Sequence, residues 1–321
     1  MQTKEDDMKV FIAGAGGALG KQLVPMLVTR GHEVTGTTTS QAKRDLMRSL
    51  GAKPVVLDLL DARAVREAVL NASPDVVVHE ATALSGSLDL RHFDRDFAMT
   101  NRLRTEGTDN LLAAALASSA KRFVAQSFAG WPSERNGSAV KGEDAPLDPN
   151  PSPKFKTTLD AIKHLESVVT GAEGIEGIAL RYGGFYGPGT SLSRHGDYTE
   201  AIRKRQFPIV GSGSGIWSFI HIEDAAAATV EAIEHGRRGI YNVVDDEPAR
   251  VSEWLPVAAK AAGAKPPRHF PLWLGRVLAG DAVVVMMTEV RGASNEKAKR
   301  ELGWQPRHSS WRTTFPEVLA A

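Results

Sequence analysis

Three glycines follow a short apolar run near the start of the chain, and their spacing restricts the fold more than any other feature. The run Val10–Ala13 is predicted to be a buried strand, and Gly14, Gly17 and Gly20 come directly after it, where a helix to about Arg30 begins. Glycine adopts positive φ without steric cost, and its missing side chain lets a phosphate group approach the backbone. Free N–H groups at the start of the helix favour the same anion. The pattern predicts a dinucleotide site on a parallel α/β sheet.

Short apolar runs alternate with helical patterns through the first half of the chain, as in successive βα units. Further strands are predicted over residues 33–38, 54–58, 75–79, 122–126 and 177–181, and long helices over residues 93–118 and 158–170. Beyond Pro188 the pattern becomes irregular. We therefore predict an α/β fold, a Rossmann doubly wound parallel sheet with a smaller C-terminal substrate lobe. The expected division is residues 1–185 for the NAD(P)-binding domain and residues 186–321 mainly for the substrate-binding lobe, with chain crossings between the two.

Composition limits the classes of partner that the chain can bind. Its 39 basic and 38 acidic residues give a formal net charge of +1, so we expect no nucleic-acid partner. The chain has no cysteine, which excludes disulfides and thiolate metal sites and suits a reducing compartment. Apolar runs such as Ala282–Met287 are far shorter than the roughly 20 residues that span a bilayer. We expect a cytoplasmic protein with a small-molecule substrate, no metal and no membrane partner.

The end of the second predicted strand indicates which dinucleotide binds. A carboxylate at this point would accept hydrogen bonds from the ribose 2′-hydroxyl of NAD. The chain instead carries Thr39 and Ser40, followed by Lys43 and Arg44, and these hydroxyls and cations suit a 2′-phosphate. NADP is therefore the predicted cofactor and NAD the alternative. The two cations are also compatible with the solvated start of a helix.

Several further motifs follow the glycine turn in a characteristic order. They include His79-Glu80-Ala81-Thr82-Ala83, Gly107-Thr108-Asp109-Asn110, Arg181-Tyr182-Gly183 and Phe219-Ile220-His221. With them the chain, from residue 9 to about residue 315, resembles the short-chain dehydrogenase/reductases of the extended or atypical type, which are NAD-dependent epimerase/dehydratase-like proteins. The resemblance implies the following cofactor contacts: Gly14, Gly16, Gly17, Ala18, Leu19 and Gly20 at the pyrophosphate, Asp58 and Leu59 at the adenine, and Ala81 and Thr82 towards the nicotinamide ribose.

The catalytic group implied by this resemblance is incomplete. Relatives that move hydride on alcohols or ketones use a Ser or Thr, a Tyr, and a Lys four residues after the Tyr, because the phenol must pass a proton and the ammonium lowers its pKa. The resemblance places Ser127 and Lys163 at the Ser and Lys positions, with Lys163 also on the nicotinamide ribose, but Leu159 stands where the Tyr is expected. Other sources of the proton remain open: Tyr186, Thr158, His164 or water.

Two further positions argue against a nucleotide-sugar substrate. Where extended relatives commonly hold a diphosphate with Arg, the chain has Trp217, and where they commonly have Asn it has Gly184. Losing a charge-assisted phosphate contact weakens such binding. We expect a small or moderately apolar substrate, bound by residues that include Tyr186, Trp217 and Arg291.

The sequence thus predicts an NAD(P)-dependent oxidoreductase with Leu159 in place of the usual catalytic Tyr. Two alternatives are a redox-silent NADP-binding sensor or scaffold and a nucleotide-sugar epimerase or dehydratase. Relatives often pair through the helices that follow the fourth and fifth strands, so a homodimer through residues 93–118 and 158–170 is expected by analogy.

Overall fold

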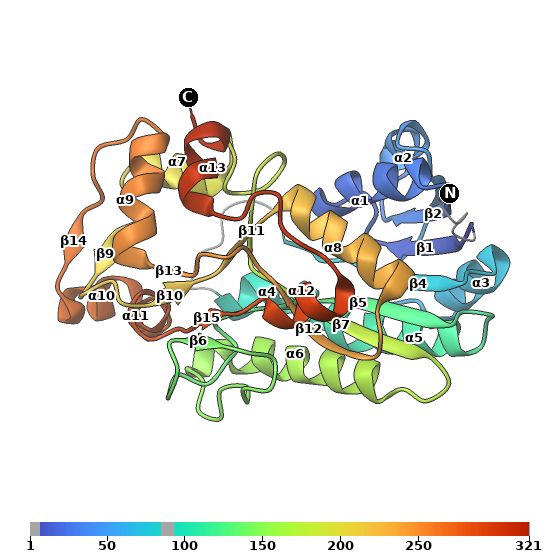
Figure 1. Ribbon diagram of the computed structural model, residues 1–321. Helices are drawn as coiled ribbons and strands as arrows, with labels where there is room; N and C mark the ends of the chain where they lie inside the picture. The colour runs from blue at the N-terminus through green and yellow to red at the C-terminus, as the bar shows by residue number, and fades with distance from the viewer. Residues whose placement is uncertain (1–6, 85–92, 321) are drawn as a thin grey trace.

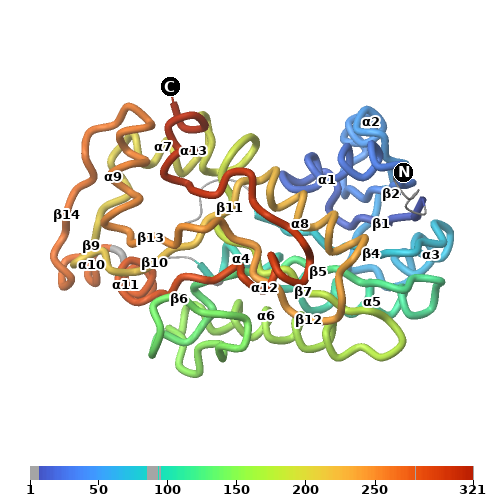
Figure 2. Tube along the Cα trace, in the orientation of Figure 1, coloured from blue at the N-terminus to red at the C-terminus, as the bar shows by residue number. Residues whose placement is uncertain are grey.

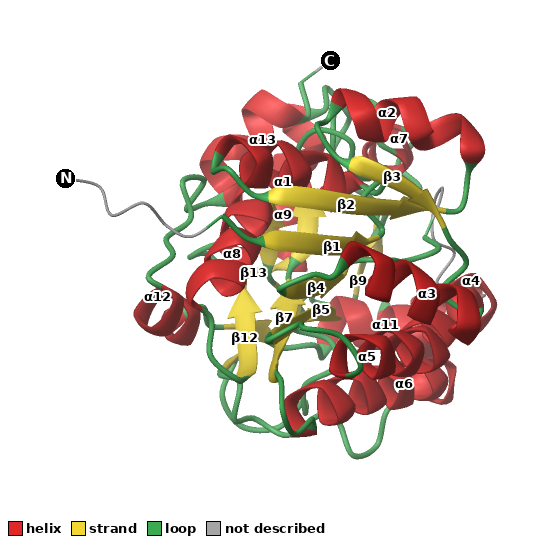
Figure 3. Ribbon diagram, turned by 90° about the vertical axis from the view of Figure 1, so that its right-hand side faces the viewer, coloured by secondary structure: helices red, strands yellow, loops and turns green. Residues whose placement is uncertain are grey.

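A seven-stranded parallel sheet forms the centre of the computed structural model, which describes residues 7–84 and 93–320 (Figures 1 and 3). In spatial order the strands are β12 (Gly239–Val243), β7 (Glu176–Tyr182), β5 (Arg122–Phe128), β4 (Val76–His79), β1 (Lys9–Ala13), β2 (Glu33–Thr38) and β3 (Lys53–Val56). The strand order reverses between β1 and β4, and doubly wound sheets bind ligands outside the carboxyl ends at such a reversal. The predicted fold class is confirmed.

Helices cover both faces of the sheet, and the alternation of side chains along β1 explains why. Val10 and Ile12 are buried with the helices α1 (Ala18–Thr29) and α8 (Ile222–His235) on one face. Phe11 and Ala13 point to the other face and are buried with residues of three other helices, α3 (Ala62–Ala72), α5 (Thr108–Leu116) and α6 (Pro153–Gly171). Successive strand side chains point to opposite faces, so an uninterrupted apolar strand needs cover on both. No helix within the described residues is long and apolar enough to cross a membrane.

The stretch predicted as one helix over residues 93–118 contains a π-helical turn. It consists of α4 (Phe93–Arg102), the turn η3 (Leu103–Gly107) and α5, which follow one another without a break. A π-helical turn shifts the register of the following side chains, and such turns are frequent at functional sites. Within this turn the side chain of Arg104 is buried, with a relative exposure of 4%.

A smaller lobe with its own core is built mainly from the last third of the chain and lies beside the carboxyl ends of the sheet (Figure 1). Its helices are α7 (Asp197–Arg203), α9 (Val251–Ala261), α10 (Leu272–Ala279), α11 (Asp281–Thr288) and α13 (Trp311–Val318). Its short strands are β8 (Gly184–Tyr186), β9 (Ile209–Val210), β10 (Ile216–Trp217), β11 (Phe219–His221), β13 (Ala249–Arg250) and β14 (His269–Phe270). Trp254, Trp311 and Phe315 form the centre of its core.

The chain passes more than once between the sheet and the smaller lobe, as Figure 2 shows. After β11 it returns to the sheet as α8 and β12, and β12 pairs with β7. The helix α12 (Glu296–Leu302) also packs near α8 and β12. Residues 131–153 include the short strand β6 (Val140–Lys141), which pairs with β15 (Gly292–Ala293). Segments far apart in the sequence therefore hold the two parts together.

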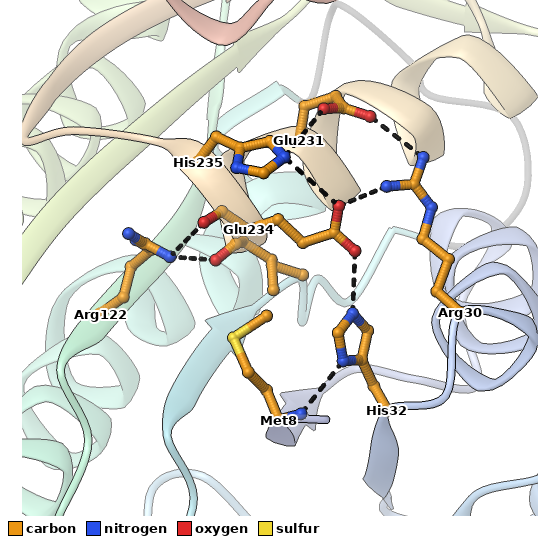
Figure 4. Close-up of polar contacts among 8 residues, drawn as sticks. Met8, Arg30, His32, Arg122, Glu231, Glu234 and His235 are labelled. Atoms are coloured by element: carbon orange, nitrogen blue, oxygen red, sulfur yellow. Dashed lines mark hydrogen bonds and ion pairs between the residues drawn. The ribbon is translucent and has the colours of Figure 1, made fainter. Parts of the chain in front are cut away.

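A cluster of polar side chains connects α8 by hydrogen bonds to residues near the amino ends of the sheet strands (Figure 4). The carboxylate of Glu234 on α8 accepts a hydrogen bond from Arg30 and lies 2.9 Å from Nε2 of His32. Nδ1 of His32 accepts the backbone N–H of Met8 at 3.2 Å, so Nε2 carries the hydrogen that Glu234 accepts. Arg122 on β5 donates to the last carbonyls of α8. These bonds position the helix at the end of the sheet opposite the glycine turn.

Candidate functional site

A large cavity lies at the carboxyl ends of the strands and is lined by residues of both the sheet and the smaller lobe. Its volume is about 1840 Å³. Pockets for a single small ligand usually measure roughly 300–1,000 Å³, so this cavity has room for a dinucleotide and a second molecule. Its lining includes the glycine turn after β1, the ends of β2, β3, β4 and β5, and residues 182–185, 188–198 and 216–219.

The glycine turn is shaped for a pyrophosphate. Gly14 has a φ of +90°, and a Cβ on it would lie 2.6 Å from the backbone nitrogen of Ala81. A Cβ on Gly20 would lie 2.4 Å from the carbonyl oxygen of Ala15. The helix α1 has Gly17 as its N-cap and no side-chain cap, so its first N–H groups are left for a ligand. All six residues predicted here line the cavity: Gly14, Gly16, Gly17, Ala18, Leu19 and Gly20.

The residues predicted at the adenine end also reach the cavity. Asp58 and Leu59 line it, and the backbone N–H of Leu60 donates to Oδ1 of Asp58 at 3.0 Å, which fixes this turn. Nδ2 of Asn110, on α5, donates to the carbonyl oxygen of Leu59 at 2.9 Å. A side chain outside the predicted set therefore holds the adenine end of the site in place.

The end of β2 carries hydroxyls and a lysine at the cavity and no acidic side chain. Thr39 and Lys43 line the cavity, and the Cδ of Lys43 lies 3.7 Å from the position of a Cβ on Gly16. Ser40 is not among the lining residues, although it was predicted to contact the cofactor. The side chain of Arg44 donates to that of Gln41 at 3.3 Å. Lys43 thus lines the cavity after β2, whereas Arg44 does not.

Residues after β4 continue the cavity wall. Ala81 and Thr82 line it as predicted, and the buried carboxyl of Glu80 lines it beside them. Tyr182 donates a hydrogen bond of 3.1 Å to Glu80 and also contacts the hydroxyl of Thr229 at 2.7 Å. Burial raises the pKa of Glu80 to about 8, so its side chain is mainly protonated at neutral pH.

The predicted catalytic side chains do not meet at this cavity. Ser127 is buried, and its hydroxyl donates to Glu166 of α6 at 2.7 Å. Lys163 lies on the exposed side of α6, and Leu159 is fully buried. None of the three belongs to the cavity lining, and neither does any other residue of α6. The cavity lining therefore includes neither Ser127 nor Lys163, and the catalytic roles expected for them stay predictions.

The register of α6 explains the placement of these side chains. Thr158 and Ile162, four residues apart, are both fully buried on the inner side of the helix. Neither carries a phenol or an ammonium, and the hydroxyl of Thr158 accepts a hydrogen bond from Asn101 at 3.0 Å. His164 lies on the partly exposed side, 2.7 Å from Asp109. The helix thus offers neither the Tyr nor the Lys of the expected group on its inner side.

Two of the predicted substrate residues lie elsewhere. Tyr186 is fully buried and packs edge-on against His221 and Phe315, with ring centroids 5.2 Å away in each case. Its ring belongs to the core of the smaller lobe and does not line the cavity. Arg291 lines a separate cavity of about 380 Å³ and donates to the carbonyl oxygen of Arg135 at 2.7 Å. Neither residue lines the main cavity, and the substrate contacts expected for them stay predictions.

Trp217, predicted to contact the substrate, lines the main cavity in a wall rich in aromatic side chains. Its Nε1–H donates to the carbonyl oxygen of Met286 at 2.8 Å, which fixes the indole ring. The aromatic lining residues are Phe93, Phe97, Phe128, Trp131, Tyr182, Phe185, Tyr198, Phe207, Trp217 and Phe219. Phe128 is the residue after Ser127, so the ring and not the hydroxyl reaches the cavity. Such a wall favours a planar, apolar group.

Arg104 is a lining residue that the sequence-based prediction missed. It lies on η3, with its guanidinium carbon 5.9 Å from the centroid of Phe97. Its neighbour Leu103 accepts a hydrogen bond of 3.0 Å from Nε2 of His79, and burial lowers the pKa of His79 to about 4. A signal was available, because Gly107, Thr108 and Leu111 follow at helical spacing on a buried side.

The comparisons with known proteins agree with this architecture. Residues 10–244 match the model of the NAD dependent epimerase/dehydratase family. The chain is 42% identical to a 3-diazoavenalumate denitrifying reductase from Streptomyces sp. over 95% of this chain and 98% of that protein. It is 29% identical to a 2-alkyl-3-oxoalkanoate reductase from Stenotrophomonas maltophilia over 80% of this chain and 76% of that protein.

Solved structures of low sequence identity share the fold. The dTDP-glucose 4,6-dehydratase DesIV from Streptomyces venezuelae, solved with NAD and TYD bound, has a TM-score of 0.75 at 18% identity and covers 97% of this chain and 95% of its own. Together with the family match, these results establish the class of the protein. The chain belongs to the NAD dependent epimerase/dehydratase family and is an NAD(P)-dependent oxidoreductase.

Proposed function

We propose that this protein is an NADP-dependent reductase that replaces the diazo group of an aromatic substrate with hydrogen and releases dinitrogen. The observation that carries the proposal is the position of Phe128 on the cavity wall while Ser127 and every residue of α6 lie outside it. The relative at 42% identity, named as a denitrifying reductase of a diazo compound, supports the same reaction.

Removal of a diazonium group explains why a phenolic acid is dispensable. Reducing a ketone leaves an alkoxide, which needs a proton from a nearby acid. A hydride that displaces a diazonium group forms a C–H bond while the C–N bond breaks, and neutral dinitrogen leaves with the electron pair of that bond. The hydride comes from bound NADPH, which is oxidised to NADP⁺. No proton has to reach the leaving group.

The chain's own residues then bind the cofactor and the substrate, orient them, and exclude water from the site. The turn Gly14–Gly20 holds the pyrophosphate through backbone N–H groups, and Lys43 with Thr39 favours the 2′-phosphate of NADP over the 2′-hydroxyl of NAD. Asp58 and Leu59 support the adenine, and Ala81 with Thr82 supports the ribose of the nicotinamide half. The aromatic wall, with Phe128 at the end of β5 and Trp131 just after it, holds a planar substrate and keeps water out.

The test is oxidation of NADPH in the presence of candidate substrates, with dinitrogen measured in parallel. The set consists of 3-diazoavenalumate, the 4-carboxybenzenediazonium ion, a ketone of similar size and UDP-glucose, each with an enzyme-free control. The proposal predicts NADPH oxidation and dinitrogen release in equal amounts, only with diazo substrates. Turnover of the ketone alone would contradict it, turnover of UDP-glucose would favour an epimerase or dehydratase, and tight NADPH binding without turnover of any compound would favour a sensor.

A homodimer through α4, α5 and α6 is part of the proposal. Leu116 on α5 is 47% exposed, and a dimer through these helices would cover this large apolar side chain. Light scattering on the purified protein should give twice the chain mass. The Leu116→Glu variant should give the monomer mass.

A further inference from the structure

We propose that Arg104 is the anchor for a carboxylate group on the aromatic framework of the substrate. The inference deepens the proposed function, on which it rests for the position of the substrate beside the aromatic wall. Arg104 belongs neither to the glycine turn nor to the Ser, Tyr and Lys group that the resemblance implies.

The guanidinium of Arg104 is buried, and at least one of its N–H donor groups has no hydrogen-bond partner among the described residues. The residue is 4% exposed, and its Nη1 has no hydrogen-bond partner among the described residues. It forms no ion pair within that part of the chain either. Burial lowers its pKa to about 10, which still leaves it charged at neutral pH. A buried charge that lacks a partner is strongly unfavourable, so an anion arriving at this position is strongly bound.

The neighbouring charges do not neutralise Arg104. Glu166 is the acid whose field reaches it, but the guanidinium of Arg181 already binds both carboxylate oxygens of Glu166 at 2.7 Å. The hydroxyl of Ser127 donates to Oε1 of the same carboxylate. His79 beside η3 is neutral at pH 7, because its pKa lies near 4. Arg104 and Arg181 carry two positive charges and Glu166 carries one negative charge, so this group has one positive charge in excess.

The position of Arg104 points to the substrate and not to the cofactor. The anionic groups of NADP are its pyrophosphate and 2′-phosphate, which belong at the glycine turn after β1 and at Lys43 after β2. Arg104 lies on η3 near His79 at the end of β4 and next to Phe97. The nicotinamide half of the cofactor carries no anion that could pair with it. Phe97 stacks on Phe93 with a centroid distance of 4.2 Å, so the cation adjoins the aromatic wall.

The test measures binding of two unreactive probes to the full-length protein saturated with NADP⁺. The probes are 4-hydroxycinnamate and its methyl ester, which has no carboxylate charge, and titration calorimetry gives both dissociation constants. The variants are Arg104→Met and, as a matched control, Arg102→Met. Arg102 lies two residues away on α4, is half exposed and pairs with Glu106 on the surface. Thermal melting and NADP⁺ affinity are measured for each variant.

We expect wild type and Arg102→Met to bind the carboxylate probe about tenfold or more tightly than the ester, a difference of about 1.4 kcal/mol. Arg104→Met should bind both probes equally while keeping its NADP⁺ affinity. Equal binding of both probes by wild type, a retained preference in Arg104→Met, or a loss of NADP⁺ affinity in that variant would each overturn the proposal. Because no turnover is needed, a protein that passes this test but releases no dinitrogen refutes only the proposed reaction.

Discussion

The hydroxyl of Ser127 donates a hydrogen bond of 2.7 Å to the carboxylate of Glu166, and this contact turns the serine away from the cavity. Glu166 is also bound by Arg181 through two hydrogen bonds of 2.7 Å. The three side chains form a buried structural network between β5, β7 and α6. In this protein the serine near the end of β5 therefore stabilises the fold and leaves the cavity wall to Phe128.

We predict that Ser127→Ala lowers stability and leaves turnover intact. Loss of a buried hydrogen bond to a charged group costs about 1.5–3 kcal/mol, and chemical denaturation measures this change. The rate of NADPH oxidation should stay within about a factor of two of wild type, well under 1 kcal/mol of barrier. Lys163→Met, at an exposed position of α6, should change neither quantity. A loss of turnover by two orders of magnitude in either variant, with the fold intact, would restore the role that the sequence suggested.

Alanine at Gly14 should disrupt the cofactor site, whereas alanine at Gly16 should be tolerated by the fold. The Cβ of Gly14→Ala would meet the backbone of Ala81 at 2.6 Å with a φ of +90°, but that of Gly16→Ala has no neighbour closer than 3.6 Å. Strain at a positive φ alone costs about 1–3 kcal/mol. Melting temperature and NADPH affinity, measured on both variants, should separate them. Equal behaviour of the two would show that the turn adjusts to a side chain.

Replacement of Lys43 should reduce the preference for NADP. Lys43→Ala should weaken NADPH binding about tenfold, or 1.4 kcal/mol, while changing NADH binding little. Lys53→Ala is the matched control, because Lys53 pairs with Glu33 at the other end of these strands. Calorimetry with both cofactors gives the comparison. If wild type itself bound NADH more tightly than NADPH, the assignment of NADP would be wrong.

The buried carboxyl of Glu80 should make stability depend on pH. Its pKa is near 8 in the folded protein and 4.5 in the reference state, so the folded protein holds the proton more tightly. Unfolding releases that proton between pH 4.5 and 8, and the free energy of unfolding falls as pH rises through this range. Glu80→Gln cannot ionise, so its stability relative to wild type should increase from pH 5 to pH 9.

Denaturation of both proteins at several pH values measures this difference. Asp245, whose pKa burial also raises to about 8, is present in both proteins, so its contribution cancels. A stability difference that does not change with pH would mean that Glu80 is already ionised at low pH in the folded protein.

Much of the fold follows from local patterns in the sequence. The apolar runs and the glycine spacing predicted the parallel sheet, because strands covered on both faces must be apolar throughout. The direction in which each side chain points was harder to predict from the sequence. Ser127 and Phe128 are neighbours on one strand, and their sequence does not show which of them points towards the cavity. That choice depends on how the end of β5 packs against α6.

Helix registers limited the prediction of the site in a similar way. The helix expected from residue 158 begins at Pro153, and its buried side carries Thr158 and Ile162 instead of Lys163. The π-helical turn η3 shifts the register between α4 and α5, and a regular helical period does not include such a shift. The spacing of Arg104 to Gly107 and Leu111 indicated a buried side, but the place of Arg104 beside Phe97 emerges only from the three-dimensional structure.

The most direct test of the account follows the hydride itself. The enzyme is supplied with NADPH deuterated on one face of C4 and with 3-diazoavenalumate, and the product is examined by mass spectrometry together with the released dinitrogen. The account predicts one deuterium on the ring carbon that lost nitrogen, one dinitrogen for each NADPH oxidised, and the same result with Ser127→Ala. Dinitrogen release without deuterium on that carbon, or a complete loss of transfer in Ser127→Ala, would contradict it.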